Sequence, residues 1–227
     1  MRLSVAAIVL CLCCSTARAA PTKFGQMADD LERRTVKLTS IKSPGGHGSA
    51  TFIRKLLITI EHVAVMVGEK VQFTHTNGVT GYAEQISTYD TKDGIDSPVI
   101  YVPVGKDLLD YGGRINEVKP DSGTNVYTAG FAKDGFLISR TRITGYFGEN
   151  VYTTTVAPFP GQSGSGLFNA DGELIAVCHG YQWQDYPPYP RRGLWVTIGS
   201  LETAGRTLEM NPSSGAEMLG SLQYTSV

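Results

Sequence analysis

The sequence carries no excess of charge of either sign and, beyond its first residues, no long hydrophobic run. Its 20 basic and 21 acidic residues give a net charge of −1, and no run of basic residues is longer than two. Nucleic-acid-binding surfaces are strongly basic because they must attract phosphates, so we expect no nucleic-acid partner. No segment after the N-terminus has the length and apolar character of a transmembrane helix, so we expect the mature chain to have no membrane contact.

Residues 1–19 have the three parts of a secretory signal peptide. Arg2 supplies a positive start, residues 3–14 are apolar but too short to span a bilayer, and residues 17–19 form a small-x-small cleavage pattern. We therefore predict that this segment is removed, that the mature chain begins at Ala20, and that the protein is secreted. The pair Arg33-Arg34 is compatible both with a second processing site and with ordinary surface charge.

Cysteine is too scarce in the mature chain for an internal disulfide. Of four cysteines, only Cys178 lies beyond the predicted signal peptide. It belongs to the apolar run 174–178, which predicts a buried strand residue rather than a reactive thiol. A single cysteine among scattered histidines also lacks the ligand spacing of a zinc site, so we expect no metal or other cofactor. A core of this size folds without disulfides.

Short runs rich in Val, Ile, Thr and Phe, separated by Gly, Pro and Asn, fill the chain after residue 34 and predict an all-β fold of barrels. The first series is 35–41, 49–53, 56–60 and 71–76, and the second is 99–104, 125–130, 136–146, 152–156, 166–168, 174–179 and 194–198. A turn-rich segment, 105–123, marks the split between two groups of strands. We therefore predict two antiparallel six-stranded barrels, about 36–115 and 120–200, within one domain spanning 20–210.

Only the segment 199–210 is predicted to be helical. Ser200 is suited to cap it, and apolar residues recur along it at helical spacing. The Ser- and Gly-bearing residues 211–227 are expected to form a flexible tail. We expect a monomer.

The segment around Ser163 has the features of a nucleophile turn. Ser163 lies between Gly161 and Gly164, after a proline and before an apolar strand. The glycines permit backbone angles that direct neighbouring N–H groups at one point, where they can stabilise a developing oxyanion. A serine is a weak nucleophile alone, so it needs a base and an acid that orients the base.

Candidates for both lie earlier in the chain. His62 follows the apolar strand 56–60, at a point where a loop can present it, and Asp96 directly precedes the apolar run 98–102. Histidine titrates near neutral pH, as a base for serine must. His47, His75 and His179 compete with His62, and Asp90 and Asp93 compete with Asp96.

The order His, Asp, Ser resembles the chymotrypsin-like serine proteases. The matching blocks are Gly48 to Ile53 with Leu57 to Val63, Asp96 to Val102, Gly161 to Gly166 with Asp171 to Ile175, and Gly193 to Ile198. The resemblance spans about 45–210. It implies a double β-barrel with the active site between the barrels, a catalytic triad of His62, Asp96 and Ser163, and an oxyanion hole formed by the N–H groups of Gly161 and Ser163.

The chain also departs from that family. Thr59-Ile60-Glu61 replaces the usual small residues before the histidine, and the paired cysteines are missing. Gln162 stands where animal digestive members have an acid that binds a freed N-terminus, which argues against a trypsin-type zymogen switch. The pattern is closest in style to the disulfide-free viral and bacterial members.

The resemblance also implies a primary substrate pocket without a carboxylate. Its lining would comprise Ala157 with Pro158, His179, Gly180, Tyr181 and Gly193. A buried Lys or Arg head would be left unpaired there, so we expect little trypsin-like cleavage. An apolar or aromatic preference is slightly favoured over Gln or Glu, which His179 would bind if it faced the pocket; strand alternation also allows it to point away.

The sequence thus predicts a serine endopeptidase that hydrolyses polypeptides through an acyl-enzyme. A catalytically inactive secreted binding protein on the same scaffold is the alternative, and a structural or adhesion domain with a chance motif is a third possibility. The natural substrate is not encoded in any motif.

Overall fold

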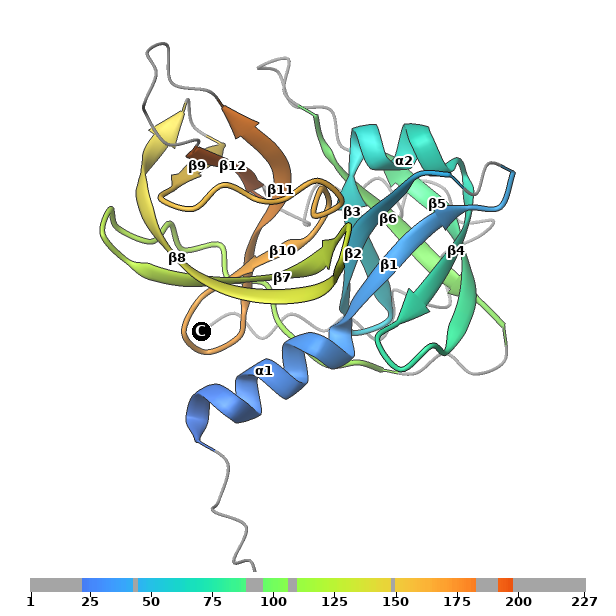
Figure 1. Ribbon diagram of the computed structural model, residues 1–227, viewed down its shortest axis with the longest axis horizontal. Coiled ribbons are helices and arrows are strands. Elements are labelled where there is room, and N and C mark those ends of the chain that lie inside the picture. Colours follow the sequence, from blue (N-terminus) through green and yellow to red (C-terminus); the bar gives the residue numbers. More distant parts are fainter. Residues whose placement is uncertain are drawn as a thin grey trace, which may run out of the picture.

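The strands form two closed antiparallel barrels of six strands each, which lie side by side (Figure 1). The computed structural model describes residues 22–42, 45–88, 96–105, 110–147, 150–182 and 192–197. In sheet order, the first barrel contains β1 (Thr35–Ser40), β2 (His47–Ile53), β3 (Leu56–Ile60), β6 (Pro98–Val104), β5 (Thr80–Thr88) and β4 (Lys70–His75). The second contains β10 (Gly166–Phe168), β11 (Leu174–Gln182), β12 (Arg192–Thr197), β9 (Val151–Thr154), β8 (Gly135–Phe147) and β7 (Asn125–Ala132). The predicted all-β double barrel is confirmed.

The barrels close around apolar side chains that the strand pattern had marked. Leu57, Ile58 and Ile60 of β3 are fully buried, because this strand lies between two others and packs against the core. In the second barrel, Trp195 is fully buried and its indole N–H donates to Thr154 Oγ1 at 2.9 Å. A buried Trp N–H needs such a partner, since leaving the donor unpaired is costly.

Cys178 is a buried residue of β11, as predicted. Its side chain is 0% exposed, and burial raises the pKa of the thiol. The thiolate is the reactive form of cysteine, so this environment keeps the group inert.

Two helices and one strand were not predicted. Helix α1 (Lys23–Arg34) begins at Thr22, whose hydroxyl accepts a hydrogen bond from the N–H of Gly25, and α2 (Glu61–Val67) directly follows β3. The prediction that only 199–210 is helical was therefore wrong. α1 buries Leu31 as its single apolar side chain, so its apolar periodicity is weak, and α2 is too short to show one. β5 was missed because its sequence is largely polar.

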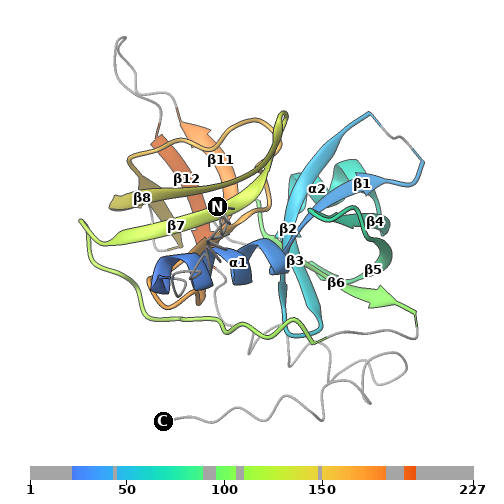
Figure 2. The same ribbon diagram turned by 60° about the horizontal axis from the view of Figure 1, so that its bottom comes forward.

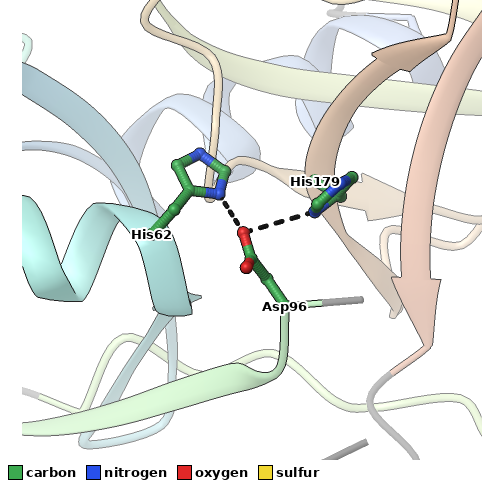
Figure 3. Close-up of side chains that lie close together, drawn as sticks. All are labelled: His62, Asp96 and His179. Carbon is green, nitrogen blue, oxygen red and sulfur yellow. Dashed lines mark hydrogen bonds and ion pairs between the residues drawn. The ribbon is translucent and has the colours of Figure 1, made fainter. Parts of the chain in front are cut away.

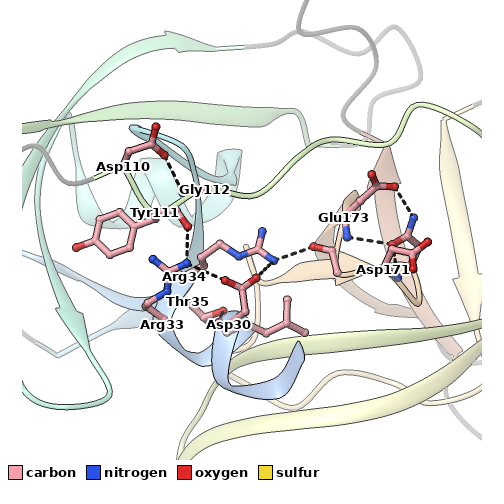
Figure 4. A network of polar contacts seen from close by, with 12 residues as sticks. Asp30, Arg33, Arg34, Thr35, Asp110, Tyr111, Gly112, Asp171 and Glu173 are labelled. Atoms are coloured by element: carbon pink, nitrogen blue, oxygen red, sulfur yellow. Dashed lines mark hydrogen bonds and ion pairs between the residues drawn. The ribbon is translucent and has the colours of Figure 1, made fainter. Parts of the chain in front are cut away.

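α1 packs along the second barrel and leads directly into β1 of the first (Figure 2). At its start, the Phe24 ring contacts Tyr127 of β7. At its end, Arg34 is 1% exposed and is held by Asp30 at 2.6 Å and by the carbonyl of Gly172 at 2.7 Å (Figure 4). Arg34 is therefore neither surface charge nor an accessible processing site, which corrects the prediction of ordinary surface charge for this residue.

No helix of the described residues has the length and apolar character needed to cross a membrane. The predicted signal peptide, the helix 199–210 and the tail 211–227 lie outside the described residues.

Candidate active site at the junction of the barrels

His62 and Asp96 are brought together by the pairing of β3 with β6. In that antiparallel register Ile60 lies opposite Pro98. The residue after Ile60, Glu61, therefore faces the residue before Pro98, Ser97. The N–H of Glu61 donates to the carbonyl of Ser97 at 2.9 Å, and the Glu61 carboxylate accepts from the N–H of Ser97 at 3.1 Å. These two bonds extend the ladder by one pair and align the following pair, His62 and Asp96.

The imidazole of His62 hydrogen-bonds to the carboxylate of Asp96 through Nδ1 and Oδ2 (Figure 3). His62 lies in the first turn of α2 rather than in the predicted loop, because the chain turns into a helix immediately after β3. Its side chain is 41% exposed and that of Asp96 is 28% exposed, so solvent and ligands can reach the pair. A carboxylate on Nδ1 leaves Nε2 as the acceptor that a general base requires.

A second histidine faces the same carboxylate from the other barrel. His179 of β11 places Nδ1 3.4 Å from Asp96 Oδ2, and its ring meets that of His62 edge-on at 5.8 Å between centroids. Burial lowers the pKa of His179; the charge of Asp96 opposes this effect and that of His62 adds to it. A register shift between Cys178 and Gly180 locally interrupts the strand alternation at this residue.

The segment with Ser163 is anchored to both barrels by its backbone. The Ser163 carbonyl accepts from the N–H of Ser49 in β2 at 2.8 Å, and the N–H of Gly164 donates to the carbonyl of Cys178 at 2.8 Å. Ser49 in turn accepts, through its own carbonyl, from the hydroxyl of Thr59 at 2.7 Å. Thr59 lies three residues before His62 and Cys178 directly precedes His179, so Ser163 is anchored to both strands that lead to the two imidazoles.

The two glycines beside Ser163 are required by their surroundings. Gly161 has φ +95° and Gly164 has φ +82°, in the left-handed region that favours glycine. A Cβ on Gly164 would lie 2.2 Å from both Ser49 O and Thr59 Oγ1, and one on Gly161 would lie 2.5 Å from His47 Nε2. The close approach of the segment to the first barrel therefore depends on the absence of side chains.

The donors expected for an oxyanion are unoccupied. Among the described residues, the N–H groups of Gln162, Gly164 and Ser165 have carbonyl partners, whereas those of Gly161 and Ser163 donate to none. The Gly161 carbonyl is instead fixed by the Ser49 hydroxyl at 3.0 Å. Two backbone donors thus remain available beside the Ser163 side chain.

The other histidines and aspartates considered from the sequence lie elsewhere. His75 is stacked on Phe52 and Tyr111 and bonds to the Tyr111 hydroxyl, in the first barrel. His47 Nε2 is buried without a hydrogen-bond partner among the described residues, next to Gly161. Asp90 and Asp93 lie outside the described residues.

The residues expected to line the substrate pocket differ in their environment. Ala157 and His179 are half-buried, Tyr181 is 38% exposed, and a Cβ on Gly180 would meet nothing within 4 Å. Gly193 is buried, and a Cβ there would lie 2.5 Å from Thr154 Oγ1 and 2.7 Å from Trp195 Nε1. Space for a ligand is therefore open at Gly180 and filled at Gly193.

Sequence reasoning missed the positioning residues Glu61, Ser97, Ser49 and Thr59. Glu61 and Ser97 flank the predicted catalytic residues, and this adjacency was the one available signal. Ser49 bonds to Ser163, which belongs to the segment of the second barrel, and Thr59 bonds to Ser49 on the neighbouring strand. These contacts join residues far apart in the sequence or on different strands, so only the tertiary structure reveals them.

Paired six-stranded antiparallel barrels, with a His–Asp pair at one barrel edge and a glycine-flanked serine segment bonded to both barrels, define a chymotrypsin-like protein. The trypsin-like peptidase domain model matches residues 45–177, which is more than half of the chain. The chain belongs to this family of trypsin-like peptidases. No curated protein is significantly similar to it in sequence.

Solved structures show the same fold at low identity. A serine endoprotease from Yersinia pestis is 18% identical with a TM-score of 0.64, over 84% of this chain and 67% of that one. A protease of M. tuberculosis in its inactive form is 18% identical with a TM-score of 0.63, over 83% and 97%. A human pathogenic astrovirus serine protease is 16% identical with a TM-score of 0.56, over 75% and 92%. At these identities the likeness concerns the fold alone.

Proposed function

We propose that this trypsin-like peptidase is a serine endopeptidase with Ser163 as nucleophile, His62 as general base and Asp96 as the acid that orients the base. The observation that carries the proposal is the His62–Asp96 hydrogen bond, which the β3–β6 register brings about next to the segment that holds Ser163. A histidine and an aspartate at other positions of the chain would not be brought into hydrogen-bond contact by this strand register.

In the proposed reaction, the Ser163 hydroxyl oxygen attacks the scissile carbonyl carbon while Nε2 of His62 takes the hydroxyl proton. Asp96 holds Nδ1 protonated and favours the imidazolium that forms. The N–H groups of Gly161 and Ser163, which lack partners among the described residues, would stabilise the oxyanion. His62 then returns the proton to the leaving amine, and water hydrolyses the acyl-enzyme by the same steps in reverse.

The substrate would be a polypeptide with an uncharged residue before the scissile bond. No carboxylate stands among the expected pocket residues, and Gly180 leaves open space. Because His179 Nδ1 faces Asp96, its role as a pocket donor for Gln or Glu loses support. We also propose that the protein is secreted after removal of residues 1–19, and that activation does not use a trypsin-type N-terminal insertion, given Gln162.

The test uses the chain from Ala20 onward, assayed with a fluorophosphonate probe and a peptide library. We expect probe labelling and cleavage after apolar or aromatic residues, with little cleavage after Lys or Arg. Ser163→Ala and His62→Ala should each reduce kcat about 10⁴-fold or more, and the double variant should lose no more than the worse single variant, because the residues act as a unit.

Ser122→Ala is the matched control, because that serine is exposed. Its hydroxyl donates to the carbonyl of Thr144, which is not a residue of the candidate site. It should retain full activity and labelling. A folded protein that neither labels nor cleaves any peptide would contradict the proposal and favour the binding-protein alternative.

A further inference from the structure

His62, Asp96 and His179 form a cluster that a catalytic pair does not need. One ligand atom from each residue lies within 4.8 Å of the other two, and the side chains converge from α2, from the segment just before β6 and from β11 (Figure 3). The proposed catalysis uses the first two. It gives no role to His179 Nδ1, which is buried, faces the site and, among the described residues, has the Asp96 carboxylate at 3.4 Å as its polar neighbour.

We propose that these three side chains bind a Zn²⁺ ion and that the bound ion inhibits the peptidase. The ion-binding part stands on the cluster alone, and the inhibitory part rests on the proposed function. Two imidazoles and one carboxylate are a donor set that suits Zn²⁺, whereas Mg²⁺ and Ca²⁺ prefer oxygen ligands throughout. Three protein ligands leave a fourth position for water.

The distances suit such a site after small side-chain movements. Ligand atoms about 2.1 Å from a tetrahedral Zn²⁺ are about 3.4 Å from one another. Asp96 Oδ2 and His179 Nδ1 are already 3.4 Å apart, whereas His62 must move away from the carboxylate to admit the ion. The partial exposure of His62 and Asp96 allows that rotation and gives the ion a path from solvent.

Inhibition follows from which nitrogen the ion takes. At rest, Nδ1 of His62 shares its proton with Asp96. Zn²⁺ would take the lone pair of Nδ1 and an oxygen of the carboxylate. A neutral imidazole has a single N–H, so the proton that leaves Nδ1 moves by way of water to Nε2. Nε2 then has no lone pair with which to accept the Ser163 proton. Removal of the ion by a chelator restores the hydrogen bond and the base.

No motif in the sequence indicates this site. The expectation that no metal is bound relied on the spacing of ligands along the sequence. These three ligands come from separate segments in two barrels. Their meeting depends on the β3–β6 register and on the packing of β11 against the first barrel.

The experiment measures binding and inhibition separately. Binding of ZnCl₂ to the Ser163→Ala protein is measured by calorimetry, with MgCl₂ as the negative ion, and inhibition is measured on the wild-type enzyme with reversal by EDTA. We expect one Zn²⁺ per chain, inhibition over the same concentration range, and affinity reduced about tenfold or more in His179→Ala. His179→Gln serves as a second variant, and His75→Gln, far from the cluster, should bind like the parent protein.

The outcomes distinguish the two proposals. Absence of Zn²⁺ binding, or equal affinity and inhibition in folded His179 variants and the parent, would overturn the metal site while leaving the peptidase assignment intact. Stoichiometric binding that depends on His179, in a protein without peptidase activity, would support the site and contradict the proposed function. Reduced binding in His75→Gln equal to that of the His179 variants would overturn the assignment of the ligands.

Discussion

Gly164 combines two constraints that act on a single residue. Its φ of +82° costs other L-residues about 1–2 kcal/mol. In addition, its Cβ position is blocked by Ser49 O and Thr59 Oγ1, both at 2.2 Å. Gly78, in the turn between β4 and β5, has nearly the same φ, +83°, and open space around its Cβ position. A substitution at Gly78 therefore measures backbone strain alone, whereas one at Gly164 measures backbone strain together with steric exclusion.

We predict that Gly164→Ala is markedly more destabilising than Gly78→Ala. Gly78→Ala should lower the free energy of unfolding by about 1–2 kcal/mol through φ alone. Gly164→Ala should cost more, because alanine pushes the nucleophile segment away from the first barrel, and it should abolish probe labelling of Ser163. Urea denaturation in a Ser163→Ala background gives the free energies, and labelling is measured with Ser163 intact. Equal losses in both variants would show that the contact with the first barrel has no energetic weight.

At the scale of an element, α1 is held to the barrels by one buried arginine as well as by the buried side chain of Leu31. Arg34 bonds to Asp30 and to the carbonyl of Gly172 in the β10–β11 turn (Figure 4). Its guanidinium lies 5.5 Å from the centroid of the Phe168 ring. Burial lowers the pKa of Arg34, and the carboxylate of Asp30 opposes that shift. Arg33, one residue earlier, donates to the same Asp30 and to the carbonyl of Tyr111, both from an exposed position.

We predict that Arg34→Ala lowers the free energy of unfolding by about 2–3 kcal/mol, because it empties a fully buried site and leaves the Gly172 carbonyl without its donor. Arg33→Ala is the matched control and should cost less than about 1 kcal/mol, as for other exposed ion pairs. Chemical denaturation of the inactive Ser163→Ala protein measures both. A similar small loss in the two variants would mean that α1 contributes little to the stability of the barrels.

At the scale of the whole molecule, buried histidines link stability to pH. Burial lowers the pKa of His47, with Lys37 adding to the effect, and burial likewise lowers the pKa of His75. The unfolded chain, with the ordinary value of 6.5, therefore binds more protons than the folded chain as the pH falls below neutrality. The free energy of unfolding therefore includes a contribution from these histidines that is fully present above pH 6.5. This contribution is lost as the pH falls from 6.5 toward the lowered pKa values of the folded state.

We predict that the urea midpoint of the Ser163→Ala protein decreases between pH 7.5 and pH 5.5. The variant that also carries His47→Gln and His75→Gln should show a shallower decrease, since two of the protons taken up on unfolding are removed. Circular dichroism at each pH gives the midpoints, and no metal is added. An unchanged slope in the variant would assign the pH dependence to other groups.

Much of this protein was readable from residue order alone. Short runs rich in Val, Ile, Thr and Phe, separated by turn residues, predicted both barrels, because β-branched and aromatic side chains pack well on a pleated sheet. Gly161 and Gly164 around Ser163 marked the candidate nucleophile turn, because they permit a backbone that other residues avoid. The order of His62, Asp96 and Ser163 completed the candidate triad.

Other features were decided only by the tertiary structure. α1 was not recognised because much of what holds it is Arg34, a polar residue that pattern analysis places on the surface. His179 was assigned to a substrate pocket, yet a register shift in β11 and the packing of two barrels place it on Asp96. Periodicity reports which face of a strand is buried, but contacts between residues far apart in the chain follow from strand register and barrel packing. No local pattern encodes these, so the catalytic residue types were available from the sequence, whereas their partners required the fold.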